Sequence, residues 1–238
     1  MSPARKPAAR KPAARKPAAR RAAESPADRR ARAAAVYRGL RKLYPGARCE
    51  LDFRNAFELA VATVLSAQCT DKRVNLVTPV LFARFPDAAA LAAAPIGEVE
   101  DIIRSTGFFR NKARSITGLA RAVVADHGGA LPDTMDALVT LPGIGRKTAN
   151  VVLGNAFGKN EGVVVDTHVG RLATRLGFSR HTDPVKVEAD LAALFPRRSW
   201  TMLAHLLIWH GRRVCDARKP RCTECGIARL CPSASFTR

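Results

Sequence analysis

Residues 141–152 read Leu-Pro-Gly-Ile-Gly-Arg-Lys-Thr-Ala-Asn-Val-Val. Gly143 and Gly145 allow backbone torsions that other residues avoid, and they let a ligand approach the main chain closely. A short helix-like run at 134–140 precedes them and a helical pattern follows. The second helix then directs its first N–H groups outward, which favours anion binding. The stretch predicts two helices joined by a hairpin that holds a DNA phosphate without reading a base; a tight turn with purely structural glycines is the alternative.

Helical patterns flank this hairpin on both sides. Ser25 is a candidate N-cap, Pro26 fits the first helical position, and Pro45-Gly46 would end that helix. Apolar residues recur at helical spacing in further segments, namely 57–65, 74–82 (with a kink expected at Pro79), 99–103, 116–124 (ending at Gly128-Gly129), 187–194 and 199–210. Only 163–165 is β-like, and it is too short for a sheet. The sequence therefore predicts an all-α fold.

The chain is strongly basic. It has 40 Lys and Arg against 20 Asp and Glu, a net charge of +20. The first 33 residues contribute about +9 of this, so the remainder is basic too. Such a charge favours a polyanionic partner, either nucleic acid or an acidic membrane surface. No run of about 18 apolar residues is present, so no membrane span is expected, and the N-terminus lacks a secretory signal.

The N-terminal tail is of low complexity. Residues 4–18 repeat Ala-Arg-Lys-Pro-Ala three times. Without large apolar side chains it cannot offset the entropy of ordering, so residues 1–24 are predicted to be disordered. The tail either attracts phosphate non-specifically or is solvated without consequence.

Four of the six cysteines lie close together near the C-terminus. Cys215, Cys222, Cys225 and Cys231 follow the spacing Cys-x6-Cys-x2-Cys-x5-Cys. Four thiolates in one loop can bind a zinc ion or an iron–sulfur cluster, and the spacing does not decide between them. Disulfides are a weaker alternative in a chain with no sign of secretion.

Lys147 and Asp166 are the candidates for chemistry. Lys147 lies in the first turn of the helix after the hairpin, where the helix dipole opposes its charge and favours loss of a proton. A neutral amine is a nucleophile that forms a Schiff base at an aldehyde-level carbon. Asp166 follows the apolar residues 163–165 and could simply cap the next helix.

Several motifs together resemble the endonuclease III family. The resemblance is carried by the hairpin at 141–152, Leu-Ser-Ala-Gln-Cys-Thr-Asp at 65–71, Val-Asp-Thr-His at 165–168 and His-Gly-Arg at 210–212 before the cysteines. It runs in consistent order from about residue 30 to 231. It implies a six-helix domain with the helix–hairpin–helix at 49–159, and a discontinuous helical iron–sulfur domain formed by 25–48 with 160–238.

The resemblance also implies an activity. Lys147 would be the catalytic lysine that attacks C1′ of a damaged nucleotide, with oxidised pyrimidines as the expected substrates, and then cleaves the strand by β-elimination. The matching aspartate, Asp166, would face the lysine across a cleft and stabilise positive charge on the sugar. The four cysteines would hold a [4Fe–4S] cluster that is structural. The expected partner is double-stranded DNA containing damaged bases or abasic sites, bound by a monomer. The expected location is the bacterial cytoplasm, in association with the nucleoid.

Further residues are implied to contact DNA. Gln68 matches the residue that enters the gap left by the flipped base, although a loop glutamine is often just solvated. Phe108 is the candidate wedge on the opposite strand, where the family often has an aliphatic residue; a role for either Phe108 or Phe109 in the core is the alternative. The hairpin and the cysteine loop would contact phosphates through Leu141, Gly143, Gly145, Arg146, Arg218, Lys219 and Arg221.

Other classes of protein remain open at this point. An adenine-specific mismatch glycosylase usually has serine in place of the lysine, and an extra C-terminal domain. Thymine- or uracil-mismatch glycosylases also usually lack the lysine. A non-catalytic DNA-binding module would not form a covalent adduct, and an electron carrier would have no use for the hairpin. Lys147 is the residue that separates this chain from the related mismatch glycosylases.

Overall fold

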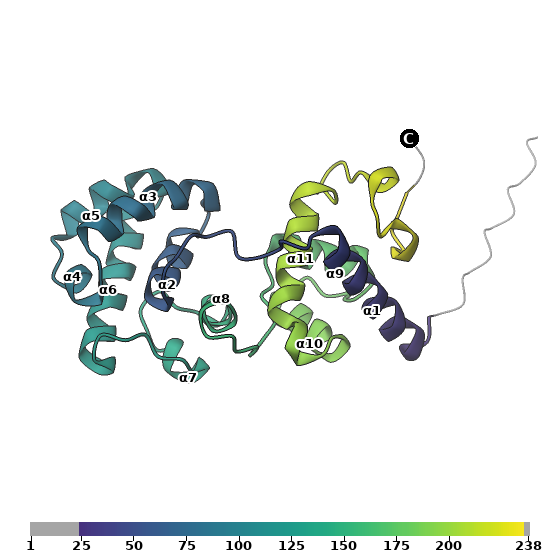
Figure 1. Ribbon diagram of the computed structural model, residues 1–238, viewed down its shortest axis with the longest axis horizontal. Coiled ribbons are helices and arrows are strands. Elements are labelled where there is room, and N and C mark those ends of the chain that lie inside the picture. The colour runs from purple at the N-terminus through teal and green to yellow at the C-terminus, as the bar shows by residue number, and fades with distance from the viewer. Residues whose placement is uncertain (1–23, 236–238) are drawn as a thin grey trace, which may run out of the picture.

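The computed structural model describes residues 24–235, and in this range it is helical and has no strand (Figure 1). Its α-helices are α1 (Pro26–Leu43), α2 (Ala56–Leu65), α3 (Asp71–Arg84), α4 (Ala88–Ala92), α5 (Ile96–Ile103), α6 (Phe109–His127), α7 (Met135–Leu138), α8 (Arg146–Ala156), α9 (Thr167–Arg175), α10 (Pro184–Leu194) and α11 (Trp200–Arg213). Short 3-10 turns occupy Arg104–Thr106, Arg197–Ser199, Cys222–Glu224 and Ala228–Leu230. The predicted all-α fold is confirmed. The disorder predicted for the tail lies outside the described residues except for Glu24.

Helix ends follow the predicted capping residues in most places. Ser25 accepts a hydrogen bond from the Asp28 amide and Pro26 opens α1. Helix α6 ends at Gly128, which has a φ of 59°. These ends could be read from the sequence because each depends on one local residue type.

The structure adds details that the sequence did not show. Thr70 caps α3 through a bond from the Arg73 amide, and Asp71 is the first residue of that helix. The short helix α4 was not predicted, since its alanines carry no periodic signal. Val124 closes the apolar segment expected at 116–124 but is 38% exposed, because it lies near the end of α6.

Two apolar cores lie side by side (Figure 1). The first core is built from α2 to α8, with buried residues between 51 and 153. The second core is built from α1, α9, α10 and α11, and its buried residues come from 33–47 and 163–227. Val151 of α8 packs against both cores. The domain boundaries predicted from the resemblance remain a prediction; the chain itself crosses from the second core to the first after α1 and returns after α8.

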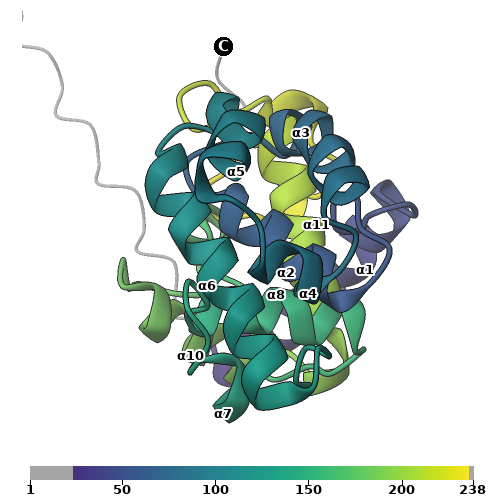
Figure 2. The same ribbon diagram turned by 90° about the vertical axis from the view of Figure 1, so that its left-hand side faces the viewer.

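Within the first half, α6 packs against α4 and α5, and α2 packs against α8 (Figure 2). Helices α3 and α5 lie at one end of this half and α7 at the other. In the second half, α11 packs against α9 and α1, and also contacts α8. The C-terminal part of α8 meets α11 where the two halves join, since Gly154 lies against Thr201 and Asn155 is hydrogen-bonded to His205. No helix in the part of the chain that the structure describes is long and apolar enough to cross a membrane.

Candidate active site

The hairpin before α8 is shaped by glycine at one position in particular. Gly143 has a φ of 79°, and a Cβ there would lie 3.0 Å from the Ser115 Cβ, so both torsion and space require glycine. Gly145 is the N-cap of α8 and supplies no side-chain cap. The first amides of α8 are therefore left without a capping side chain, as an anion site at a helix start requires.

Two other hairpin residues have surroundings that the sequence did not reveal. Leu141, expected to contact DNA, is only 4% exposed and belongs to the first core. Its amide bonds to the Leu138 carbonyl and its own carbonyl accepts from Ile144, so it anchors the hairpin from below. Arg146 is exposed, but its Nη2 lies 3.1 Å from Oε1 of Glu188 in α10. This ion pair joins the start of α8 to the second half of the molecule.

Lys147 and Asp166 line the same cavity. The cavity has a volume of about 270 Å³ and lies between the end of α2, α8, α11 and residues 48–51. Asp166 caps α9, and its Oδ1 accepts a bond of 2.8 Å from the Val169 amide. Lys147 is exposed in the first turn of α8. The capping role open at the sequence level is thus confirmed for Asp166, and it leaves the second carboxylate oxygen free of hydrogen bonds within the described chain.

A histidine on α11 also lines this cavity, and the sequence analysis did not single it out. Nε2 of His205 lies 2.7 Å from Oδ1 of Asn155. Asn155 donates its own Nδ2 to the Val151 carbonyl, which fixes the amide orientation and makes His205 Nε2 the donor. Burial lowers the pKa of His205 to about 4, so the ring is neutral. The available signal was a histidine within an almost wholly apolar helix.

Gln68 and Phe108 share an unusual backbone. Among the described residues they are the two non-glycine positions with positive φ, at 52° and 48°. Such conformations are sparsely populated and often mark functional sites. Gln68 lines the cavity with Lys147. Phe108 is 65% exposed, whereas Phe109 packs against the first core. The core role left open for the two phenylalanines therefore belongs to Phe109 and not to Phe108.

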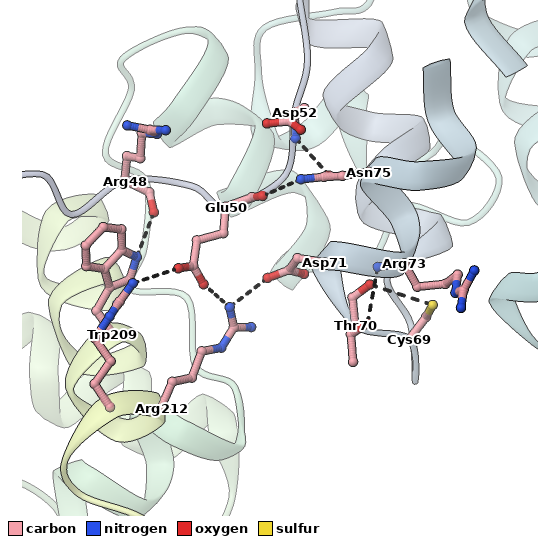
Figure 3. A network of polar contacts seen from close by, with 11 residues as sticks. Arg48, Glu50, Asp52, Cys69, Thr70, Asp71, Arg73, Asn75, Trp209 and Arg212 are labelled. Atoms are coloured by element: carbon pink, nitrogen blue, oxygen red, sulfur yellow. Dashed lines mark hydrogen bonds and ion pairs between the residues drawn. The ribbon is translucent and has the colours of Figure 1, made fainter. Parts of the chain in front are cut away.

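Several residues that line this cavity belong to an ion-pair network (Figure 3). Arg212 of α11 contacts Glu50, and its Nη1 lies 2.8 Å from Oδ2 of Asp71 at the start of α3. Arg213 adds a 3.3 Å contact to Glu50, and the Trp209 indole donates to the Arg48 carbonyl. The network ties α11 to α3 and to the segment that connects the two halves.

The four C-terminal cysteines line one small cavity of about 30 Å³ beside α9 and α11, and all are free thiols. Burial raises the pKa of Cys225 and Cys231, and the neighbouring thiols add to the effect. Mutual repulsion of this kind is relieved when a cationic group binds. Among the described residues, no three His, Cys, Asp or Glu side chains are arranged to hold a single metal ion. Cys49 and Cys69 lie apart, against the first core.

Two arginines of α9 hold the beginning of the cysteine loop. Arg175 lies 3.2 Å from Sγ of Cys215 and donates to the Asp216 and Ala217 carbonyls. Arg171 donates to the Cys215 carbonyl. The sequence offered no signal for these contacts, because they join residues about 40 positions apart.

The basic residues of this loop differ in whether their side chains already have partners within the protein. The backbone amides of Arg218 and Lys219 bond to Oδ1 of Asp216, and both side chains are exposed. Arg221 is paired with Glu224 at 3.5 Å and also donates to the Arg213 carbonyl. Arg218 and Lys219 are thus the more available pair for an external anion.

Comparisons with known proteins agree with this arrangement. The family model described as "HhH-GPD superfamily base excision DNA repair protein" matches residues 61–197. The endonuclease III of Synechocystis sp. is 55% identical over 208 residues, which cover 87% of this chain and 95% of that protein. The endonuclease III of Bacillus subtilis is 46% identical over 190 residues, or 79% and 86% of the two chains.

A solved structure of a trapped endonuclease III–DNA covalent intermediate is also similar. It is 42% identical, has a TM-score of 0.81, and the match covers 86% of this chain and 96% of that one. The family model, the two relatives and the solved structure thus all point to the same family. The protein therefore belongs to the endonuclease III family of the HhH-GPD superfamily of base excision DNA repair proteins.

Proposed function

We propose that Lys147 is the nucleophile of this enzyme. By its family the chain is a DNA N-glycosylase and AP lyase, and DNA is its partner. The observation that carries the proposal is the position of Lys147, which stands at the uncapped start of α8 and lines one cavity with Asp166. An amine and a carboxylate that line one cavity suit covalent catalysis at C1′ of a flipped nucleotide.

The proposed reaction has two stages at the same amine. Lys147 Nζ bonds to C1′ of the damaged nucleotide, the glycosidic bond breaks, and the base leaves with the bonding electrons and takes up a proton. The sugar ring opens and an imine forms between C1′ and Nζ. Loss of a proton from C2′ then expels the 3′ phosphate, which breaks the strand. Water finally hydrolyses the imine and restores the lysine.

Asp166 supports both stages from the cap of α9. Its Oδ1 is occupied by the Val169 amide, which holds the carboxylate in place. The other oxygen is available to accept the proton that Lys147 must lose before it attacks. The negative charge also stabilises the positive charge that develops on the sugar.

The damaged base is proposed to enter the 270 Å³ cavity. The expected substrates are oxidised pyrimidines in double-stranded DNA. His205 and Asn155 contribute neutral polar groups to the wall. Neutral donors and acceptors recognise an uncharged pyrimidine edge without the desolvation cost of a buried charge.

DNA contacts are proposed at three places. Gln68 fills the gap left by the base, and the exposed Phe108 wedges into the opposite strand. The backbone of Gly143 and Gly145, the first amides of α8 and Arg146 hold one phosphate. Leu141 supports that hairpin from the core and is not proposed to touch DNA. The cysteine loop adds phosphate contacts through Arg218, Lys219 and Arg221. One protein molecule is proposed to bind one site.

The four C-terminal cysteines are proposed to hold a [4Fe–4S] cluster. They surround one cavity, so a single group can bind all four, and the Cys-x6-Cys-x2-Cys-x5-Cys spacing that resembles the endonuclease III family supports a four-iron cluster over zinc. A four-iron cluster binds one cysteine per iron and spaces its ligands more widely. The cluster would fix the cysteine loop against α9 and α11 and would take no part in breaking bonds.

Lys147→Gln tests the nucleophile. The variant should lose borohydride trapping on DNA that contains an abasic site, while its affinity for that DNA stays within a few-fold of the parent protein. Lys42→Gln, which removes an exposed lysine at the end of α1, is the matched control and should trap normally. Normal trapping by Lys147→Gln would remove this residue from the nucleophile role.

Cys222→Ser tests the cluster. The parent protein should contain iron and absorb visible light, and the variant should lose most of both. Cys69→Ser, at a cysteine far from the loop in sequence and packed on the first core, should keep both. A colourless parent protein that contains zinc would contradict the proposed cluster.

A further inference from the structure

A buried lysine connects the two segments that carry Gln68 and Phe108. Lys112 lies in the first turn of α6 and is only 5% exposed. Its Nζ donates to the carbonyl of Leu65 at 2.8 Å and to the carbonyl of Thr106 at 2.7 Å. A lysine is almost never this buried without a partner, and here both partners are main-chain oxygens.

The two carbonyls have a specific place in the chain. Leu65 is the last residue of α2, three positions before Gln68. Thr106 ends the 3-10 turn Arg104–Thr106, two positions before Phe108. One ammonium group therefore holds the two segments at a fixed separation, just before Gln68 in one segment and Phe108 in the other take the left-handed backbone conformation. Lys112 is itself only four residues after Phe108, so its own backbone is fixed close to that residue.

Stability alone does not explain this arrangement. Burial lowers the pKa of the Lys112 ammonium, because the charged form loses its hydration. No carboxylate among the described residues compensates for that cost by an ion pair with Lys112. An apolar side chain at such a site often gives equal or greater stability than a buried charge. What the lysine adds, and an apolar residue cannot, is a directional link between two loops.

We propose that Lys112 is a positioning residue that sets the spacing of Gln68 and Phe108, so that both enter the duplex together when the base leaves. The inference rests on the insertion roles proposed above for these two residues. It deepens that function by assigning their alignment to a residue that touches no DNA. Gap filling on both strands requires the two side chains to arrive at the correct separation, and misplacement by about 1 Å can reduce a rate about 100-fold.

The test compares two substrates in single-turnover reactions. Base release from a lesion in duplex DNA requires gap filling, whereas strand cleavage at an abasic site in single-stranded DNA does not. Lys112→Met keeps the length of the side chain and removes the link. It should slow duplex base release about tenfold or more and change single-strand cleavage by less than about twofold. Lys112→Arg, which keeps the charge and the donors, should restore part of the loss. Equal slowing on both substrates would overturn the proposal.

A double-mutant comparison separates this proposal from the one it rests on. If Lys112 acts through Gln68 and Phe108, Lys112→Met should cause little further loss in a Gln68→Ala, Phe108→Ala background. Additive losses would overturn the positioning role. If the double alanine variant itself releases the base at the parent rate, the insertion roles fail instead. Should Lys112→Met not fold, Lys112→Gln, which removes the charge and keeps an amide NH2 group, is measured with the same two substrates and judged by the same criteria.

Discussion

Arg212 Nη1 lies 2.8 Å from Asp71 Oδ2 (Figure 3), and both residues line the cavity that Lys147 and Asp166 also line. The two residues are 141 positions apart, one on α11 and the other at the start of α3. Glu50 contacts the same guanidinium from the segment that connects the two halves. Asp71 is also only three residues after Gln68, so the network links the second half of the molecule to the loop proposed to fill the duplex gap.

Asp71→Asn should affect activity more than stability. Both side chains of the pair are partly exposed, so its loss should cost about 1 kcal/mol or less, which for a protein of this size corresponds to a fall in Tm of about 4 °C at most. Duplex base release should slow several-fold, because the Gln68 loop loses its link to α11. Glu98→Gln, which breaks the Arg84 ion pair between α3 and α5, is the control. A parental rate of base release in Asp71→Asn would contradict the link.

Asp166→Asn separates the two roles of this residue. Asparagine caps helices as well as aspartate does, so the Tm should change by only a few degrees. Loss of the charge removes the proton acceptor that we propose for Lys147, and single-turnover base release should fall 100-fold or more, in line with the contribution of a general base. Asp183→Asn makes the same change at the cap of α10 and should leave the rate unchanged.

A stable Asp166→Asn protein with parental activity would restrict Asp166 to capping. A protein that unfolds would instead show that its charge, and not only its hydrogen bond to Val169, holds the start of α9. Thermal unfolding and single-turnover rates, measured on the same preparations, distinguish these outcomes.

The sequence predicted what depends on local residue types. The glycine at 143, the cap at Ser25 and the cap at Asp166 each act over a few residues, so their roles could be read directly. The exposure of Phe108 could not be decided, because two adjacent phenylalanines give the same apolar signal. The structure separates them through the left-handed backbone at Phe108, which turns its side chain outward while Phe109 begins α6.

Long-range polar contacts were not predictable from a single sequence. Arg146 pairs with Glu188 over 42 positions, and Lys112 reaches Leu65 over 47. Periodicity shows which face of a helix is buried, but it does not name the partner of a charged group. Lys112 did carry a usable signal: it lies four residues before Ile116 on the buried face of α6, a position where a lysine needs acceptors.

Glu188→Gln should strengthen DNA binding. Arg146 is proposed to contact a phosphate, and in the free protein its guanidinium is paired with Glu188 at 3.1 Å. Removing the carboxylate charge frees Arg146 and also removes repulsion of the DNA backbone. Affinity for undamaged duplex should therefore rise several-fold at low salt, and the slope of log K against log salt should steepen by up to about 0.9, the value for one added phosphate contact.

Two further variants complete the binding experiment. Arg146→Gln should weaken binding and reduce the slope by a similar amount. Glu161→Gln, which breaks a surface pair with Arg197, controls for the change in net charge. Equal gains in affinity from Glu188→Gln and Glu161→Gln would show that only net charge matters and would remove Arg146 from the phosphate site.

His205 should make the folded state sensitive to acid. Burial lowers its pKa from 6.5 to about 4, so in this pH range the unfolded chain binds more protons than the native protein. The free energy of unfolding should therefore be highest above pH 6.5 and fall as the pH drops towards 4, by up to about 1.4 kcal/mol per pH unit for each such histidine. His205→Gln keeps a donor for Asn155 and does not titrate, so its unfolding free energy should fall less steeply over this window. The slope should not vanish, because burial also lowers the pKa of His210 to about 4.

His181→Gln, at an exposed histidine, is the control for the His205 variant. Urea unfolding at several pH values measures the slopes, and identical slopes for the parent protein and His205→Gln would show that His205 is not buried in its neutral form.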